Sequence, residues 1–211
     1  MFNLISRGGP IMYPLLICSI VSVTIIIERA IFWLRMKRRS DKNLVYRILE
    51  LSEQGFYERA YEAGKSSSDY IVNMLINGIA HRNYSLPSAL EMSADEALKR
   101  MRRYLNILDT IITVAPLLGI FGTVLGIINS FDILGLAQIA QPQIVTKGIA
   151  QALITTAAGL AVAIATVIPY NYFLSRIDHF SKEMEKFATS LEITHERNQN
   201  RATATGQEMS S

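Results

Sequence analysis

The chain has 211 residues, half of them apolar, and a formal net charge of only +3. Asp, Glu, Lys and Arg are absent from three runs, at residues 11–27, 110–131 and 148–174. A helix that spans a bilayer needs about 20 mostly apolar residues. A soluble fold is excluded for most of the chain, because the remaining segments are too short and too polar to bury three such helices. The sequence therefore predicts an all-α membrane protein with three transmembrane helices.

The first predicted segment, residues 1–34, contains a short N-terminus and transmembrane helix 1. Its apolar run reaches the required length by continuing to Leu34, which places Glu28 and Arg29 near the membrane interface. A cleaved signal peptide is the alternative, but no small-residue cleavage site closes the run. The run ends in aromatic and basic residues, which are typical of a membrane interface. We therefore expect a retained helix.

Residues 35–104 are expected to form a small bundle of amphipathic helices. Apolar residues recur there at helical spacing, and they are Leu44, Ile48, Leu51, Ile71, Leu75 and Ile79. Breaks between the short helices are expected at Gly55, at Gly64 and at the serines of residues 66–68.

A new helix is predicted to start at Ser85 and Pro87, and no further breaker occurs before Pro116. Proline is tolerated inside membrane helices where neighbouring groups satisfy the freed carbonyl. One helix is therefore expected from residue 87 to about residue 132, roughly 68 Å at 1.5 Å per residue. The part at residues 105–134 is the predicted transmembrane helix 2.

The last predicted segments are a periplasmic loop at residues 135–146, transmembrane helix 3 at residues 147–174, and an extension at residues 175–211. Apolar residues at helical spacing carry helix 3 beyond its membrane part. The polar stretch from Asn198 predicts a disordered tail.

The basic residues predict the orientation of the chain. Thirteen of the 21 Lys and Arg residues lie between Arg35 and Arg103, and five more follow Leu174. Because Lys and Arg collect on the cytoplasmic side, the bundle and the C-terminus are expected in the cytoplasm and the N-terminus in the periplasm. These charges are expected to anchor the chain at the lipid surface and not to bind nucleic acid.

Helices 2 and 3 each carry one face of small residues, which permits close helix packing. These residues are Pro116, Gly119, Thr123, Gly126 and Ser130 in helix 2, and Ala152, Thr156, Gly159, Ala163 and Thr166 in helix 3. Packing between helices explains most of the glycines and alanines.

The threonines on these faces have two interpretations. Thr123 and Thr156 lie near mid-membrane, with Thr155 and Gln151 close to them. Each hydroxyl could simply bond to a carbonyl of its own helix. Several hydroxyls on adjacent small faces also favour a narrow polar seam, which would line a pore or grip another helix.

Neither of the two long apolar runs contains Asp, Glu, His, Lys or Arg. Ionisable side chains inside a membrane mark ion pathways, so a proton path here would need a carboxylate from a partner subunit. The three histidines have no metal-ligand spacing, and neither a phosphate-binding loop nor a nucleophile elbow occurs. We expect no metal, no cofactor and no enzyme activity.

Two long motifs resemble the ExbB/TolQ/MotA family. They are TVAPLLGIFGTVLGIINSF at residues 113–131 and GIAQALITTAAGLAVAI at residues 148–164, the second followed by IPYNY at residues 168–172. The Glu28–Arg29 pair that ends helix 1 also fits. The resemblance is greatest to the three-span branches, ExbB and TolQ.

The resemblance implies a bacterial inner-membrane subunit that forms a ring, a homopentamer, around the single membrane helices of an ExbD- or TolR-like partner. Proton flow past an aspartate of that partner would drive motion that passes to a TonB- or TolA-like protein. On this model Thr123, Thr156, Thr155 and Gln151 line the proton path. The residues expected to pack against the partner helix are Pro116, Gly119, Gly126, Ala152, Gly159 and Ala163.

Gln151 departs from the family pattern, which often has Glu at this place. Because Gln can hydrogen-bond but cannot titrate, the threonines and the partner aspartate are the expected route. TonB-type energised uptake is the first interpretation of the function. A TolQ-like envelope motor, a Na⁺-driven version and a non-conducting scaffold remain as alternatives.

Overall fold

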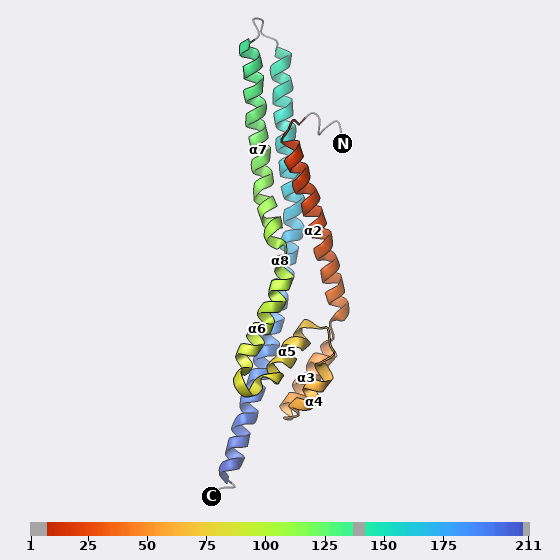
Figure 1. Cartoon of the computed structure of the whole chain (residues 1–211), viewed down its shortest axis with the longest axis vertical. Helices are drawn as coiled ribbons and strands as arrows, with labels where there is room; N and C mark the ends of the chain where they lie inside the picture. Colours follow the sequence, from red (N-terminus) through yellow and green to blue (C-terminus); the bar gives the residue numbers. More distant parts are fainter. Residues whose placement is uncertain (1–7, 137–141, 209–211) are drawn as a thin grey trace. The chain divides into compact units, whose positions relative to one another are not determined.

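The computed structural model describes residues 8–136 and 142–208, and every element in these two ranges is a helix. Three of the described helices are long and apolar enough to cross a membrane: α2 (Met12–Arg39), α7 (Leu105–Leu136) and α8 (Pro142–Glu208) (Figure 1). The three predicted membrane helices are thereby confirmed as apolar helices of sufficient length. Residues 135–136 and 142–146 of the predicted loop are helical, since α7 ends at Leu136 and α8 begins at Pro142, and residues 137–141 lie outside the described ranges.

The chain divides into two compact units. The apolar unit comprises Met1–Ala30 and Tyr104–Phe173, and the polar unit comprises Ile31–Arg103 and Leu174–Ser211. Both α2 and α8 begin in the apolar unit and end in the polar unit. Each unit has its own buried side chains.

In the apolar unit, α2, α7 and α8 meet around the buried side chains of Leu15, Ile111 and Ala115. Half-buried apolar residues of all three helices pack against them, among them Cys18, Leu118, Ala158 and Val162. Burying such side chains removes apolar surface from water or lipid and gives the helices many dispersion contacts. The single cysteine of the chain is thus one of the small apolar residues around this core.

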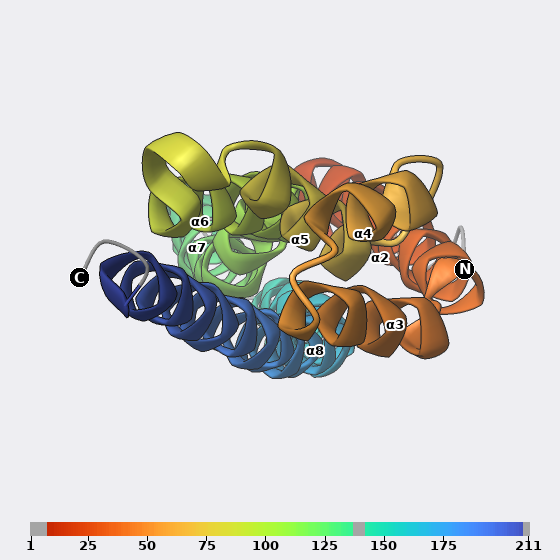
Figure 2. The same cartoon turned by 90° about the horizontal axis from the view of Figure 1, so that it is seen from below.

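The polar unit contains four short helices and the C-terminal part of α8 (Figure 2). These are α3 (Lys42–Glu53), α4 (Tyr57–Gly64), α5 (Tyr70–Ala80) and α6 (Arg82–Arg102). The amphipathic pattern and the predicted breaks are confirmed, and the turn at Gly55 has a φ of +78°, which glycine adopts without strain. Asp69 caps α5 by accepting hydrogen bonds from the backbone N–H groups of Ile71 and Val72.

The single long helix expected from residue 87 to about residue 132 is wrong. The helix start before Pro87 is confirmed, because Ser85 leaves the helical conformation (φ −160°, ψ 91°). The helix then stops at Arg102, and α7 starts only at Leu105. Tyr104 between them has a φ of +67°, and its ring lies 5.7 Å from the guanidinium carbon of Arg29. No glycine or proline marks this break, so the local sequence gives no indication of it.

The disordered tail expected from Asn198 is also wrong for the described residues, because α8 continues to Glu208. The Asn198 side-chain amide donates to the Ser52 carbonyl (2.8 Å) and to the Tyr57 hydroxyl (3.0 Å). The ring of His195 packs edge-on against Tyr57. These contacts hold a polar stretch whose composition alone would not order it.

Candidate functional site

Glycines bring α7 and α8 into close contact inside the apolar unit, where the two helices run side by side (Figure 1). A Cβ atom on Gly119 would lie 3.1 Å from the Thr156 Cα, and one on Gly159 would collide with the Ala115 carbonyl. A Cβ atom on Gly126 would lie 3.3 Å from that of Ala152. Any larger residue at these glycines would therefore push the helices apart.

The close approach places two threonine hydroxyls against each other. The Oγ1 atoms of Thr123 and Thr156 are 2.5 Å apart, and each lies 3.1 Å from the carbonyl oxygen of Gly119. Thr123 reaches the carbonyl of its own helix, whereas Thr156 reaches across from α8. Both threonines are half-buried. We call these two residues the threonine pair.

The threonine pair has more contacts than protons. Each hydroxyl has one proton to donate and two lone pairs to accept with. The two hydroxyls and the Gly119 carbonyl make three oxygen–oxygen contacts, but the hydroxyls have only two protons between them. At any moment, therefore, at least one of the three contacts is not a hydrogen bond. The pair can therefore change its hydrogen bonds by rotating a hydroxyl, which lets it donate to a carboxylate or accept from a carboxylic acid.

Thr155 and Gln151 lie close to each other on α8, but unlike the threonine pair they contact the residues just before α2. The Thr155 hydroxyl is fully buried and donates to the carbonyl of Gly8 (2.8 Å) or of Gln151 (3.0 Å). A Cβ atom on Gly9 would collide with the side-chain amide of Gln151. Both predicted site residues thus contact the segment that precedes α2, a contact that no sequence pattern indicates.

The remaining predicted site residues lie on α7 and α8 as expected. Ala152 and Ala163 are buried, and Pro116 is half-buried within α7. Gly119, Gly126, Ala152 and Gly159 contact the neighbouring helix of the same chain. A second role for these residues against a partner helix stays a prediction.

Sequence reasoning missed Gly148 and the close contact of Thr155 with Gly122. A Cβ atom on Gly148 would collide with the Ser130 hydroxyl, which itself donates to the Gly126 carbonyl (2.7 Å). A Cβ atom on Gly122 would collide with the Thr155 methyl group. Both contacts could have been expected from the sequence, because α7 and α8 also carry glycines outside the two faces of small residues described above.

The described residues contain no group of three or more His, Cys, Asp or Glu side chains that could hold a metal ion. The site is therefore built from hydroxyls, backbone carbonyls and closely packed small residues.

A family model for the MotA/TolQ/ExbB proton channel family matches residues 65–186, which is more than half of the chain. The chain belongs to this family. The matched region contains the threonine pair, all of α7, the first two-thirds of α8 and part of the polar unit. The family resemblance of the two motifs is thereby confirmed.

Relatives within the MotA/TolQ/ExbB family include both ExbB and TolQ proteins. An ExbB-like biopolymer transport protein of Synechocystis is 35% identical over 188 residues, which cover 86% of this chain and 72% of the relative. The biopolymer transport protein ExbB of Salmonella typhimurium is 26% identical over 201 residues, covering 89% and 81%. The Tol-Pal system protein TolQ of Haemophilus influenzae is 35% identical over 99 residues, covering 47% and 43%. Similarity to these ExbB proteins thus extends over more of the chain.

Proposed function

We propose that the chain is the ring-forming subunit of a proton-driven motor in the bacterial inner membrane. A single-span partner of the ExbD or TolR type supplies an aspartate inside the membrane. Protonation and deprotonation of that aspartate move the partner relative to the ring. The motion passes to a TonB-like protein, in keeping with the greater coverage by ExbB relatives.

The observation that carries this proposal is the threonine pair within apolar runs that lack any charged side chain. The two apolar runs at residues 110–131 and 148–174 contain no Asp, Glu, His, Lys or Arg. Thr123 and Thr156 nevertheless bring two hydroxyls and a carbonyl oxygen to one place between α7 and α8. Such a group can solvate a partner's carboxyl in either protonation state, because hydroxyls both donate and accept.

The driving force is sufficient for this cycle. One charge that crosses the membrane is worth about 2.3 kcal/mol per 100 mV. A ligand or proton that shifts an equilibrium by a few kcal/mol changes its populations strongly. Neutralising the aspartate also lowers the cost of exposing it to an apolar wall.

A packing scaffold is the second candidate, and one observation favours it. Gly119, Gly126 and Gly159 already have contacts within one chain, and the hydroxyls of Thr123 and Thr155 can bond to carbonyls of their own helices. In that case the small residues would only hold α7 to α8, the hydroxyls would only bond to backbone carbonyls, and no ion would pass.

Proton uptake into proteoliposomes distinguishes the two functions. The chain is reconstituted with its ExbD-like partner, and Thr156→Val is compared with Thr166→Val on the same helix. The Thr166 hydroxyl donates to the Val162 carbonyl of its own helix (2.7 Å), so this second variant removes a hydroxyl without touching the threonine pair.

We expect Thr156→Val, and an aspartate-to-asparagine change in the partner, to abolish uptake while the complex stays intact. Thr166→Val should retain it. Equal uptake by wild type and Thr156→Val would exclude the threonine pair from the proton path. The absence of both H⁺ and Na⁺ flux from a complete complex would overturn the motor and favour the scaffold.

A further inference from the structure

The polar unit contains a cavity of about 490 Å³ where α2 ends. Its walls come from the last turns of α2, the residues before α3 and α5, and one stretch of α8. Cavities of several hundred cubic ångströms are of the size that binds small ligands or headgroups. None of these residues belongs to the threonine pair.

The cavity wall is strongly basic. Five cationic side chains line it against two carboxylates. The cations are Arg35, Lys37, Arg39, Lys42 and Arg176.

Both carboxylates of the wall already have partners. Glu183 pairs with Lys42 at 3.0 Å, and this contact raises the pKa of the Lys42 ammonium, which therefore stays charged. Asp69 accepts hydrogen bonds from backbone N–H groups, those of Asp41, Ile71 and Val72.

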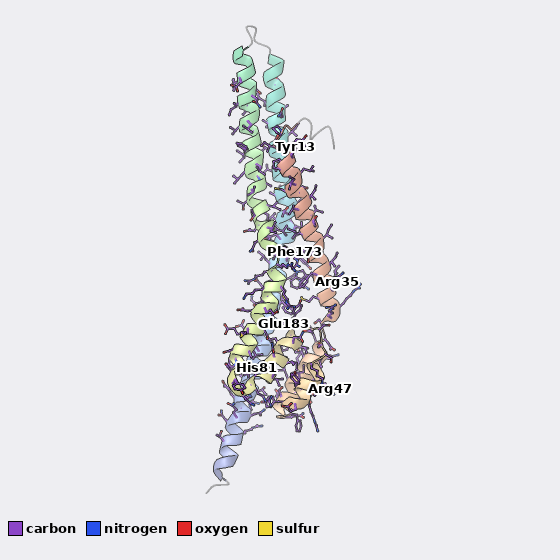
Figure 3. The ribbon with its side chains drawn as sticks, viewed as in Figure 1. Tyr13, Arg35, Arg47, His81, Phe173 and Glu183 are labelled. Carbon is purple, nitrogen blue, oxygen red and sulfur yellow. The ribbon has the colours of Figure 1, made fainter. Side chains whose placement is uncertain are left out.

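Three further cations of the cavity wall are not neutralised by a carboxylate as Lys42 is. Arg35, Lys37 and Arg39 make no ion pair with any residue that the structure describes. Figure 3 labels Arg35, near the end of α2, and Glu183, on α8. The local excess of positive charge is therefore available to an anion.

Trp33 gives a second, independent indication of a missing ligand. It lines the cavity and is only 7% exposed, yet its indole Nε1–H is a buried donor without a hydrogen-bond partner among the described residues. A buried N–H that lacks an acceptor destabilises the fold, because the donor has lost its hydrogen bond to water and gained none in return. The guanidinium of Arg176 lies over the same ring, 5.6 Å from its centroid. An acceptor oxygen in the cavity would satisfy the donor and meet the cations at once.

We propose that this cavity binds the phosphate group of an anionic phospholipid. Phosphate oxygens accept from guanidinium, ammonium and indole donors alike, and arginine suits them especially because its donors form a planar fork. Clustered Lys and Arg residues directly after a membrane helix are typical of anionic-lipid sites.

The position of the cavity on α2 favours a lipid over a soluble phosphate. Helix α2 is one of the three helices that are long and apolar enough to cross a membrane. Ile31 and Leu34, in the turns that approach the cavity, expose 43% and 63% of their apolar side chains. Tryptophan, here Trp33, is enriched at the level of lipid headgroups. Acyl chains could thus follow α2 while the headgroup enters the cavity.

Trp33 provides the test, because it is the only tryptophan in the sequence. The full chain is reconstituted in phosphatidylcholine nanodiscs that contain increasing fractions of phosphatidylglycerol brominated near the glycerol. Bromine quenches tryptophan fluorescence on contact. We expect saturable quenching at mole fractions where brominated phosphatidylcholine quenches only weakly. Equal quenching by the two brominated lipids would overturn the proposal, and this comparison needs no variant.

A matched pair of variants separates the cavity from general surface charge. Arg35→Gln with Arg39→Gln removes two cations of the cavity wall, and we expect the lipid fraction at half-quenching to rise about thirtyfold. Arg38→Gln with Arg47→Gln removes the same charge from residues that do not line the cavity, and should leave the midpoint unchanged. Equal losses in both would assign the effect to diffuse charge and overturn the site. Lys37→Gln replaces the first variant if that variant does not fold.

Inorganic phosphate distinguishes the two sources of the anion. It is added to the wild-type chain in pure phosphatidylcholine nanodiscs, where we expect no saturable change in Trp33 emission. A saturable change without anionic lipid would overturn the lipid assignment and make the cavity a site for a soluble phosphate. None of these readouts depends on proton flow.

Discussion

Hydroxyl groups of the membrane helices differ in the carbonyl that each one can reach. Thr166 donates within its own helix, to the Val162 carbonyl. Thr156 reaches the Gly119 carbonyl of α7, and Thr155 reaches the Gly8 carbonyl before α2. Their common residue type hides these different roles, because the position around the helix axis decides which neighbour a side chain meets.

Gly159 of α8 lies directly against a backbone carbonyl of α7, that of Ala115, so its replacement should be costly. Gly159→Leu would force a side chain against the Ala115 carbonyl. We expect a loss of about 1–3 kcal/mol in stability, as for other overpacked sites. Thermal unfolding in detergent measures this loss. Ala161→Leu, at an exposed position of the same helix, is the control, and an equal loss in both variants would contradict the close contact.

Helix ends in this protein depend on contacts that are distant in sequence. Tyr104 separates α6 from α7 by adopting a left-handed conformation, with its ring next to Arg29. Asn198 anchors the last part of α8 to Ser52 and Tyr57. Neither residue is a standard breaker or helix former, so local propensity gives no indication of either result.

Two substitutions at Tyr104 test the left-handed break. Both Tyr104→Val and Tyr104→Asn remove the ring, but only asparagine tolerates a φ of +67°. We expect the valine variant to be less stable by about 1–2 kcal/mol. Thermal unfolding of the two variants side by side measures the difference. If valine proves as stable as asparagine, the chain does not hold this conformation.

Asn198→Ala should release the end of α8. The change removes two hydrogen bonds at about 1 kcal/mol each. Amide hydrogen exchange should become faster from residue 198 onward while the membrane part of α8 stays protected. Asn200→Ala, at an exposed position, should have no effect; faster exchange in both variants would mean that composition alone governs this end.

At the scale of the whole molecule, most of the surface of the three apolar helices is not buried by other parts of the same chain. At most 28% of the residues in the most apolar window of each span are buried inside the structure. Large apolar side chains such as Leu117, Phe121 and Ile164 remain exposed on α7 and α8. Lipid or further chains must cover this surface, since apolar groups of this size are not stable against water.

Orientation in the membrane can be tested by cysteine labelling in intact cells. In a Cys18→Ser background, Ser68→Cys should react with an impermeant thiol reagent only after the cells are opened. Pro10→Cys should react without that step. The expectation rests on the Lys and Arg residues that follow the first apolar run. The reverse labelling pattern would show that the chain is inserted the other way round.

Local features made much of this fold predictable. The three membrane helices follow from hydropathy alone, because each run must satisfy its backbone internally once it leaves water. The short helices of the polar unit follow from apolar spacing and from breakers such as Gly55 and Gly64. The small faces of α7 and α8 could likewise be found by counting along each helix.

Only the tertiary structure decided which groups meet. The contact between Thr123 and Thr156 requires the rotation of one helix against another, and the orphaned Trp33 donor requires the walls around it. The break at Tyr104 and the ordered end of α8 likewise depend on residues far away in the chain. A sequence records the propensity of each segment. The distance between two segments depends on side-chain packing across the whole fold, and that is the physical reason why these four features could not be predicted.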